Sequence, residues 1–192
     1  MQLALPKPMT REQFLAWEER QELRYEFDGF EPVAMTGGTA AHSRLQRNIT
    51  IAVGGRLRGT PCEFHGSDLK IETASGFRYS DGFVACSPIA ADATVVREPV
   101  VIFEVLSDST ARTDLVTKNR EYAAIETVRC YIVLAQDAMA GTLFERIGDD
   151  WVGHLLNADS VLRMPEIGIE VALAELYDGV ELTAADPETL AR

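Results

Sequence analysis

The pattern of apolar and polar positions predicts two buried strands with a helix between them. Residues 99–106 form an apolar run that one acidic residue, Glu104, interrupts, and residues 130–135 form a second apolar run. Continuous runs of this kind are typical of strands buried on both faces of a sheet. Residues 113–126 carry apolar side chains at helical spacing. The order of strand, helix and strand favours a central sheet with flanking helices.

The N-terminal region predicts a helix followed by a β-hairpin. Residues 10–13 fit a capping box at the start of a helix over about residues 11–22. The Asp28-Gly29 pair lies between two β-prone runs, which predicts a hairpin with a two-residue turn. Pro32 has no main-chain N–H to donate and therefore favours an edge strand.

The remaining segments complete a mixed fold. The pattern predicts a helix over about residues 40–57, strands over residues 62–72 and 77–86, and a meander of short strands over residues 142–182. The fold class is therefore α/β (α+β), a central mixed sheet flanked by helices, with an N-terminal helix–hairpin and a C-terminal β-meander. We expect a single domain over residues 1–192, with its core over about residues 10–182 and a polar tail over about residues 184–192.

Composition indicates an ordinary globular protein, with 46% apolar and 25% charged residues. The three cysteines, Cys62, Cys86 and Cys130, form no CxxC pair, and we expect all three to be buried thiols in a reducing compartment.

No apolar run approaches the roughly 18 residues of a membrane span. The N-terminal residues also lack the apolar segment of a secretion signal. These features predict a cytoplasmic protein that makes no use of a membrane.

The net charge of −12 bears on the choice of partner. Proteins that bind nucleic acid usually present basic patches to the phosphates, and here only Arg44, Arg47 and Arg58 gather on one helix face. An acidic total favours a carboxylate-rich site that binds a cation.

Two acidic residues occupy positions that the strand patterns would fill with uncharged ones. Glu104 shares its strand face with Val100 and Ile102, and a buried carboxylate is costly unless it is paired or binds a metal ion. The alternative is a residue at the strand end that reaches solvent or pairs with an arginine. Asp81 precedes Gly82, which we expect to leave the site open to a ligand. An Asp before a Gly also suits a plain turn.

Lys118 is the third candidate. It lies three residues after Leu115 and four before Tyr122, on the apolar stripe of its predicted helix. The chain has only three lysines, Lys7, Lys70 and Lys118, against fifteen arginines, so a lysine at an inward position suggests a need for a compact ammonium. The alternative is a side chain that extends along the sheet to solvent.

Two acids and a lysine form a recognised chemical set. Asp81 and Glu104 are the hard oxygen ligands that Mg²⁺ prefers, and Mn²⁺ is a second possibility. A bound Mg²⁺ lowers the pKa of a water and stabilises charge on a phosphate, while a lysine can hold the attacking water or neutralise the developing charge.

At these positions the sequence resembles the restriction-endonuclease-like family of the Uma type, within the PD-(D/E)XK nuclease superfamily. The resemblance spans about residues 10–182 and rests on the following stretches: residues 25–29, the helix with His42, residues 79–81, residues 104–110, and Asp114 through Lys118 to Tyr122.

The resemblance implies a restriction-endonuclease-like fold and metal-dependent hydrolysis of phosphodiester bonds in DNA. It implies that Asp81 and Glu104 bind the metal and that Lys118 is the catalytic lysine, moved from the strand to the following helix. It places His42 and Glu26 near the site. Ser107 and Thr110 match the signature loop, and with Arg44 and Arg47 they are our candidates for contacts with nucleic acid.

The sequence departs from the superfamily pattern in three places. Ser80 replaces the proline before the aspartate, Leu106 replaces the lysine two residues after Glu104, and Ala135 stands where an acid often follows the later strand. The alternative function is a catalytically degenerate nuclease-fold protein that acts as a homodimeric binding module. A homodimer is expected for either function.

A second charged pattern resembles a catalytic motif but has a simpler explanation. Asp68, Lys70 and Glu72 share one face of a predicted strand, and we expect an exposed ladder of charges there rather than a site.

Overall fold

The computed structural model describes residues 8–35, 37–107 and 110–182, and it has the mixed α+β architecture that the sequence predicts. The central feature is a six-stranded mixed sheet with the order β11-β10-β9-β8-β6-β3. Its strands are β3 (Glu63–His65), β6 (Gly82–Ala85), β8 (Pro99–Val105), β9 (Cys130–Leu134), β10 (Gly141–Ile147) and β11 (Asp150–Leu156).

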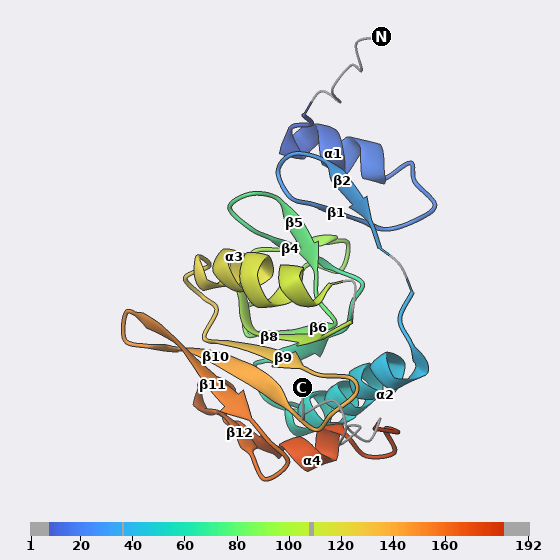
Figure 1. The fold of residues 1–192 in the computed structure, drawn as a ribbon. Helices are drawn as coiled ribbons and strands as arrows, with labels where there is room; N and C mark the ends of the chain where they lie inside the picture. The colour runs from blue at the N-terminus through green and yellow to red at the C-terminus, as the bar shows by residue number, and fades with distance from the viewer. Residues whose placement is uncertain (1–7, 36, 108–109, 183–192) are drawn as a thin grey trace.

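The two apolar runs form the middle of this sheet. β8 and β9 are parallel and pair from Val101 with Cys130 to Val105 with Leu134. A parallel pair needs a crossover connection, and here the helical segments η2 (Thr113–Lys118) and α3 (Asn119–Ala123) provide it. These helical segments cover one face of the sheet, where Tyr122 contacts a cluster with Ile102 and Tyr131 (Figure 1).

The other face is covered by α2 (Ala40–Ile49) and its continuation η1 (Thr50–Gly54). Leu45 and Ile49 are buried there against Val101, Phe103 and further residues of the sheet. The antiparallel pair β12 (Val161–Met164) and β13 (Ile169–Ala172) closes this core, together with η3 (Pro165–Ile167) and α4 (Leu173–Leu176). The site described below lies between the two helical layers.

A second sheet carries the N-terminal part of the chain, with the order β2-β1-β5-β4-β7. Its strands are β1 (Tyr25–Phe27), β2 (Pro32–Ala34), β4 (Lys70–Glu72), β5 (Phe77–Tyr79) and β7 (Val95–Val96), and α1 (Arg11–Glu18) packs against it. β2 is an edge strand, as Pro32 predicted, and Thr10 and Gln13 form the predicted capping box.

Three details of the predicted strands were wrong. The hairpin loop has four residues rather than two, because the Asp28 carboxylate accepts hydrogen bonds from the main-chain N–H groups of Phe30 and Glu31 and extends the turn. The segments 62–72 and 77–86 are also not single strands. Each breaks in the middle and continues in the other sheet, so that β3 and β6 belong to one sheet and β4 and β5 to the other.

The expectation for the cysteines was wrong for two of the three. Cys62 and Cys86 are joined by a disulfide, and only Cys130 is a buried free thiol among the described residues. The strand register explains the pairing, because β3 and β6 are antiparallel and Glu63 pairs with Ala85. The next residues outward are the two cysteines, which therefore face each other at the end of the ladder.

No helix in residues 8–35, 37–107 or 110–182 is long and apolar enough to cross a membrane.

Reduction of this disulfide should lower the free energy of unfolding by about 2–4 kcal/mol, because it frees a closed loop in the unfolded chain. The measurement is urea denaturation of the parent with and without reductant. The Cys62→Ser/Cys86→Ser variant is the control, and its stability should not respond to reductant. Equal stability of the parent under both conditions would contradict the prediction.

Candidate active site

The site begins where the chain passes from the second sheet to the first. β5 ends at Tyr79 and β6 begins at Gly82, so Asp81 lies at the junction. The Asp81 N–H donates to the Phe103 carbonyl at 3.1 Å, and the pairing of Gly82 with Phe103 places Asp81 opposite Glu104. Both acids therefore lie at the same end of the sheet, next to the carboxyl end of β8.

Three groups hold the Asp81 carboxylate. It accepts hydrogen bonds from the main-chain N–H of Val105 at 2.6 Å and from Gln46 Nε2 at 2.7 Å. His42 Nε2 lies 3.3 Å from Asp81 Oδ2, and this contact raises the pKa of the imidazole although burial opposes the charged form. His42 thus lies at the site, where the family resemblance placed it. Gln46 was missed, although it follows His42 by one helical turn on the same face.

Glu104 is buried, as its apolar surroundings indicated, with 4% of its surface exposed. Its Oε1 accepts hydrogen bonds from Lys118 Nζ at 2.9 Å and from the Tyr122 hydroxyl at 3.4 Å. Burial raises the pKa of the Glu104 carboxyl well above its usual range, and the Lys118 ammonium only partly offsets this. Neither alternative for Glu104, an exposed strand end or pairing with an arginine, matches this environment.

Lys118 points inward and is 5% exposed. Its ammonium donates to the Tyr79 carbonyl at 3.2 Å and lies 3.0 Å from Glu26 Oε1 and 3.3 Å from Asp114 Oδ1. With Glu104, three carboxylates surround this one cation. Although burial favours the neutral amine, these carboxylates raise the pKa of Lys118 well above its usual range. Lys118 ends the π-helical segment η2 rather than lying in a regular α-helix, and π-helical turns occur frequently at functional sites.

Glu26 connects this cluster to the second sheet. Its Oε1 also accepts a hydrogen bond from the Tyr79 N–H at 3.1 Å, and its Oε2 lies 3.3 Å from Arg78 Nη1. Arg78 in turn donates to both oxygens of Glu121, at 2.7 and 2.8 Å. Neither Arg78 nor Glu121 was expected at the site. Arg78 precedes Asp81 by three residues in an apolar strand, which is the one signal that could have identified it.

The cluster carries an excess of negative charge. The cluster contains five carboxylates, those of Glu26, Asp81, Glu104, Asp114 and Glu121, and two basic groups, those of Lys118 and Arg78. With all five carboxylates ionised, three negative charges remain, or two when His42 is protonated. Asp114 Oδ1 is buried and accepts no hydrogen bond from the described residues. Such an excess is stable in a protein interior only with protons or a further cation.

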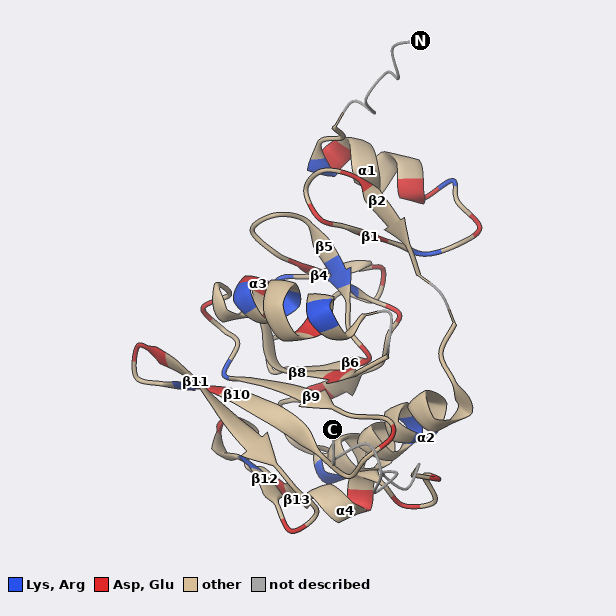
Figure 2. Ribbon diagram, viewed as in Figure 1, with Lys and Arg blue, Asp and Glu red and all other residues tan. Residues whose placement is uncertain are grey.

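The four candidates for contact with nucleic acid lie on two separate segments, α2 and the turn that follows β8. Arg44 lies on the face of α2 that is opposite His42 and Gln46, and Arg47 donates to the Asn48 side chain at 3.0 and 3.2 Å. Ser107 Oγ and Thr110 Oγ1 are 2.9 Å apart in the turn that follows β8. In Figure 2 acidic and basic positions are interspersed over the ribbon.

Two further expectations were wrong. Gly82 does not leave open space, because a Cβ atom there would lie 2.4 Å from the ring of Phe64, so this glycine permits aromatic packing against the strand. The charged residues 68–72 do not form an exposed ladder. Lys70 is buried and pairs with Glu18 Oε2 at 2.7 Å, while Asp68 pairs with Arg24 at the surface.

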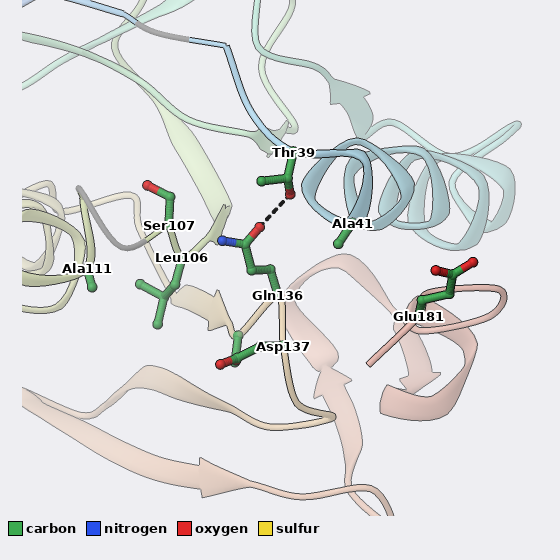
Figure 3. A pocket seen from close by; sticks show the side chains of 9 residues that line it. Thr39, Ala41, Leu106, Ser107, Ala111, Gln136, Asp137 and Glu181 are labelled. Atoms are coloured by element: carbon green, nitrogen blue, oxygen red, sulfur yellow. Dashed lines mark hydrogen bonds between the residues drawn. The ribbon is translucent and has the colours of Figure 1, made fainter. Parts of the chain in front are cut away.

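An open cavity of about 550 Å³ adjoins the site (Figure 3). It lies between the first turn of α2 and the segments that follow β8 and β9. Thr39 Oγ1 donates to Gln136 Oε1 at 2.6 Å across its wall. The residues that line it are Thr39, Ala41, Leu106, Ser107, Ala111, Ala135, Gln136, Asp137 and Glu181. Leu106 and Ser107 directly follow Glu104 and Val105, so the cavity lies next to the end of the strand that carries Glu104.

Comparison with known proteins agrees with this geometry. An uncharacterised protein of Synechocystis, slr1290, is 30% identical over 176 residues, which are 90% of this chain and 93% of that protein. A second one, sll1609, is 28% identical over 78% of this chain and 87% of its own length. The crystal structure of "a putative nuclease belonging to DUF820" from Anabaena variabilis has the same fold, with a TM-score of 0.74 and 15% identity, and the match covers 89% of this chain and 98% of that one. The model of the Uma2 family, described as "Putative restriction endonuclease", matches residues 11–174, and the chain therefore belongs to this family.

Proposed function

We propose that this protein is a metal-dependent endonuclease that hydrolyses phosphodiester bonds in DNA. The observation that carries the proposal is the convergence of Asp81, Glu104 and Lys118 at one end of the sheet, beside an open cavity. Membership of a family described as "Putative restriction endonuclease" and the fold shared with "a putative nuclease" support the same reaction class.

The donor set fits Mg²⁺. No group of three or more acidic, histidine or cysteine side chains in the described parts of the chain has the arrangement of a metal site, so the proposed ion would have two protein ligands. Mg²⁺ keeps several waters and is usually bound by one or two carboxylates together with substrate phosphates. Asp81 and Glu104 supply that number, and one divalent cation would offset two of the excess negative charges around them.

The residues of the chain then have distinct tasks. A bound Mg²⁺ would supply a water of lowered pKa and would stabilise charge on the phosphate. Gln46, His42 and the Val105 N–H hold the Asp81 carboxylate in a fixed orientation. Lys118 keeps its positive charge next to Glu104, where an ammonium can orient an attacking water or stabilise negative charge on the phosphate.

One observation favours the second candidate, a nuclease fold that serves as a homodimeric binding module. The lining of the cavity contains Asp137 and Glu181 and no lysine or arginine among the described residues. With a net charge of −12, this surface offers little to neutralise a phosphate backbone. The experiment must therefore separate metal binding from cleavage.

The test combines calorimetry and plasmid nicking on the same samples. Mg²⁺ and Mn²⁺ are titrated into the parent and into Asp81→Asn, and both are then incubated with supercoiled plasmid at low salt. We expect the parent to bind the metal and to nick the plasmid, and Asp81→Asn to lose both properties. Asp150→Asn, on the distant strand β11, is the matched control and should behave as the parent.

The two functions predict different results. Metal binding that requires Asp81, without cleavage of plasmid or of single-stranded DNA, would favour the degenerate module. The absence of metal binding in a folded parent would overturn the assignment of the site.

A further inference from the structure

Lys118 is a flexible side chain that must hold one position. An ammonium on a four-carbon stem is a point charge with rotatable donors, and it has no planar geometry to fix its direction. The Lys118 ammonium donates to Glu104 and to the Tyr79 carbonyl and lies 3.3 Å from the Asp114 carboxylate. The position of the ammonium therefore depends on how firmly each of these oxygens is held.

Glu26 is the acceptor that is itself shared. One of its oxygens faces Lys118 at 3.0 Å and the other faces Arg78 at 3.3 Å. The strand register explains the second contact, because the pairing of Phe27 with Phe77 places Glu26 opposite Arg78 on neighbouring strands. The side chain of Glu26 is only 12% exposed, so little solvent screens either contact.

Arg78 is anchored by a bidentate ion pair. Its guanidinium makes two parallel hydrogen bonds with Glu121, which also accepts a hydrogen bond from Ser75 Oγ at 2.7 Å. A bidentate pair of this kind fixes both the distance and the plane of the guanidinium. Within the described part of the chain Arg78 makes no hydrogen bond or ion pair with Asp81, Glu104 or Lys118.

We propose that Arg78, anchored by Glu121, is a positioning residue that fixes the Lys118 ammonium through the Glu26 carboxylate that the two basic groups share. This inference rests on the proposed role of Lys118 in hydrolysis. Its test does not require an active enzyme, because it observes the lysine side chain itself.

The chain has only three lysines, which makes Lys118 directly observable. Labelling with ¹³C,¹⁵N-lysine gives three sets of side-chain signals, which Lys70→Arg and Lys118→Arg variants assign. In Arg78→Met we expect the Cε signal of Lys118 to shift, while that of Lys70 stays in place because the Lys70 ammonium contacts Glu18 and the Tyr79 hydroxyl and, among the described residues, makes no hydrogen bond or ion pair with Glu26 or Glu121. Lys70 therefore serves as an internal control for a general change in the fold.

Two further variants test the route through Glu26. In Glu26→Gln the Lys118 signal should also shift, and the double variant Arg78→Met/Glu26→Gln should shift it no further than Glu26→Gln alone. Arg146→Met is the matched control, since Arg146 is a partly buried arginine that donates to the carbonyls of Val128 and Ala123 and, among the described residues, makes no hydrogen bond or ion pair with Glu26, Glu104 or Lys118. It should leave both lysine signals unchanged.

An unchanged Lys118 signal in folded Arg78→Met, or additive shifts in the double variant, would overturn the proposal. Where Arg78→Met does not fold, Glu121→Gln replaces it, because this variant keeps the Arg78 charge and weakens its anchor, and the same outcomes apply. If the parent protein does not nick plasmid but the Lys118 signal shifts in Arg78→Met, the positioning role is supported and the proposed function is contradicted. If the parent nicks plasmid but the Lys118 signal stays in place in Arg78→Met, the proposed function is supported and the positioning role is contradicted.

Discussion

Replacing Lys118 with methionine should lower the free energy of unfolding by about 3–5 kcal/mol, because the change leaves buried carboxylates without their cation. Glu104, Glu26 and Asp114 all lie within 3.3 Å of Lys118 Nζ, and their side chains are between 2% and 12% exposed. Methionine has a similar length and fills the same space, so little of the loss should come from packing. Urea denaturation at neutral pH measures the difference.

A second substitution tests whether the lost charge of Lys118, rather than a change in side-chain volume, causes the loss of stability. The double variant Lys118→Met/Glu104→Gln removes one of the uncompensated carboxylates and should recover part of the lost stability. A double-mutant cycle over these variants gives the coupling between the two residues. If the double variant were less stable than Lys118→Met, then packing would be the cause and the electrostatic explanation would be wrong.

Glu104→Gln should have opposite effects on function and on stability. We expect the proposed metal-dependent cleavage to fall by about 100- to 1,000-fold or more, because the amide is a poor ligand for Mg²⁺ and carries no charge. The unfolding free energy of the metal-free protein should stay the same or increase. Burial and the neighbouring Asp81 and Asp114 carboxylates disfavour the charged form of Glu104, as its raised pKa indicates. A neutral group of the same shape removes that cost.

Glu18→Gln provides the matched control for this prediction. Glu18 is also a buried carboxylate paired with a lysine, since its Oε2 lies 2.7 Å from Lys70 Nζ and its Oε1 accepts from the Tyr79 hydroxyl at 3.1 Å. Here one carboxylate faces one lysine, so its neutralisation leaves Lys70 as an uncompensated buried charge. Glu18→Gln should therefore lose stability and keep activity. A loss of stability in both variants would show that the excess of carboxylates around Lys118 has no energetic effect.

The sequence predicted the parts of the fold that depend on local patterns. The buried strands β8 and β9, the capping box at Thr10 and the edge position of β2 all follow from short stretches of sequence, and the structure confirms them. The family resemblance extended the prediction of the fold to the whole architecture. The strand breaks near residues 66–69 and at residues 80–81 were not predictable in this way. They reflect the change of the chain from one sheet to the other, which no local pattern records.

The residues of the candidate site divide in the same way, into those that a local sequence pattern reveals and those that only the tertiary structure reveals. An acid within an apolar strand and a lysine on an apolar helix stripe were visible in the sequence, because each one violates a local pattern. Arg78 violates its pattern too, but an arginine near a strand end is often exposed, and only its Glu26 and Glu121 partners from other segments show that it is buried. The disulfide between Cys62 and Cys86 was hidden for a related reason, since it depends on the antiparallel pairing of β3 with β6.

The contact between Glu26 and Lys118 crosses from one sheet to the layer that covers the other. The N-terminal helix–hairpin is thus not a detachable accessory. A chain trimmed to the strands and the helix that carry Asp81, Glu104 and Lys118 would keep all three residues of the proposed catalytic set, yet it would leave Arg78 and Lys118 without their shared carboxylate. Whether a shortened or fused relative keeps a complete site should therefore be judged by the counterpart of Glu26 as well as by those of Asp81, Glu104 and Lys118.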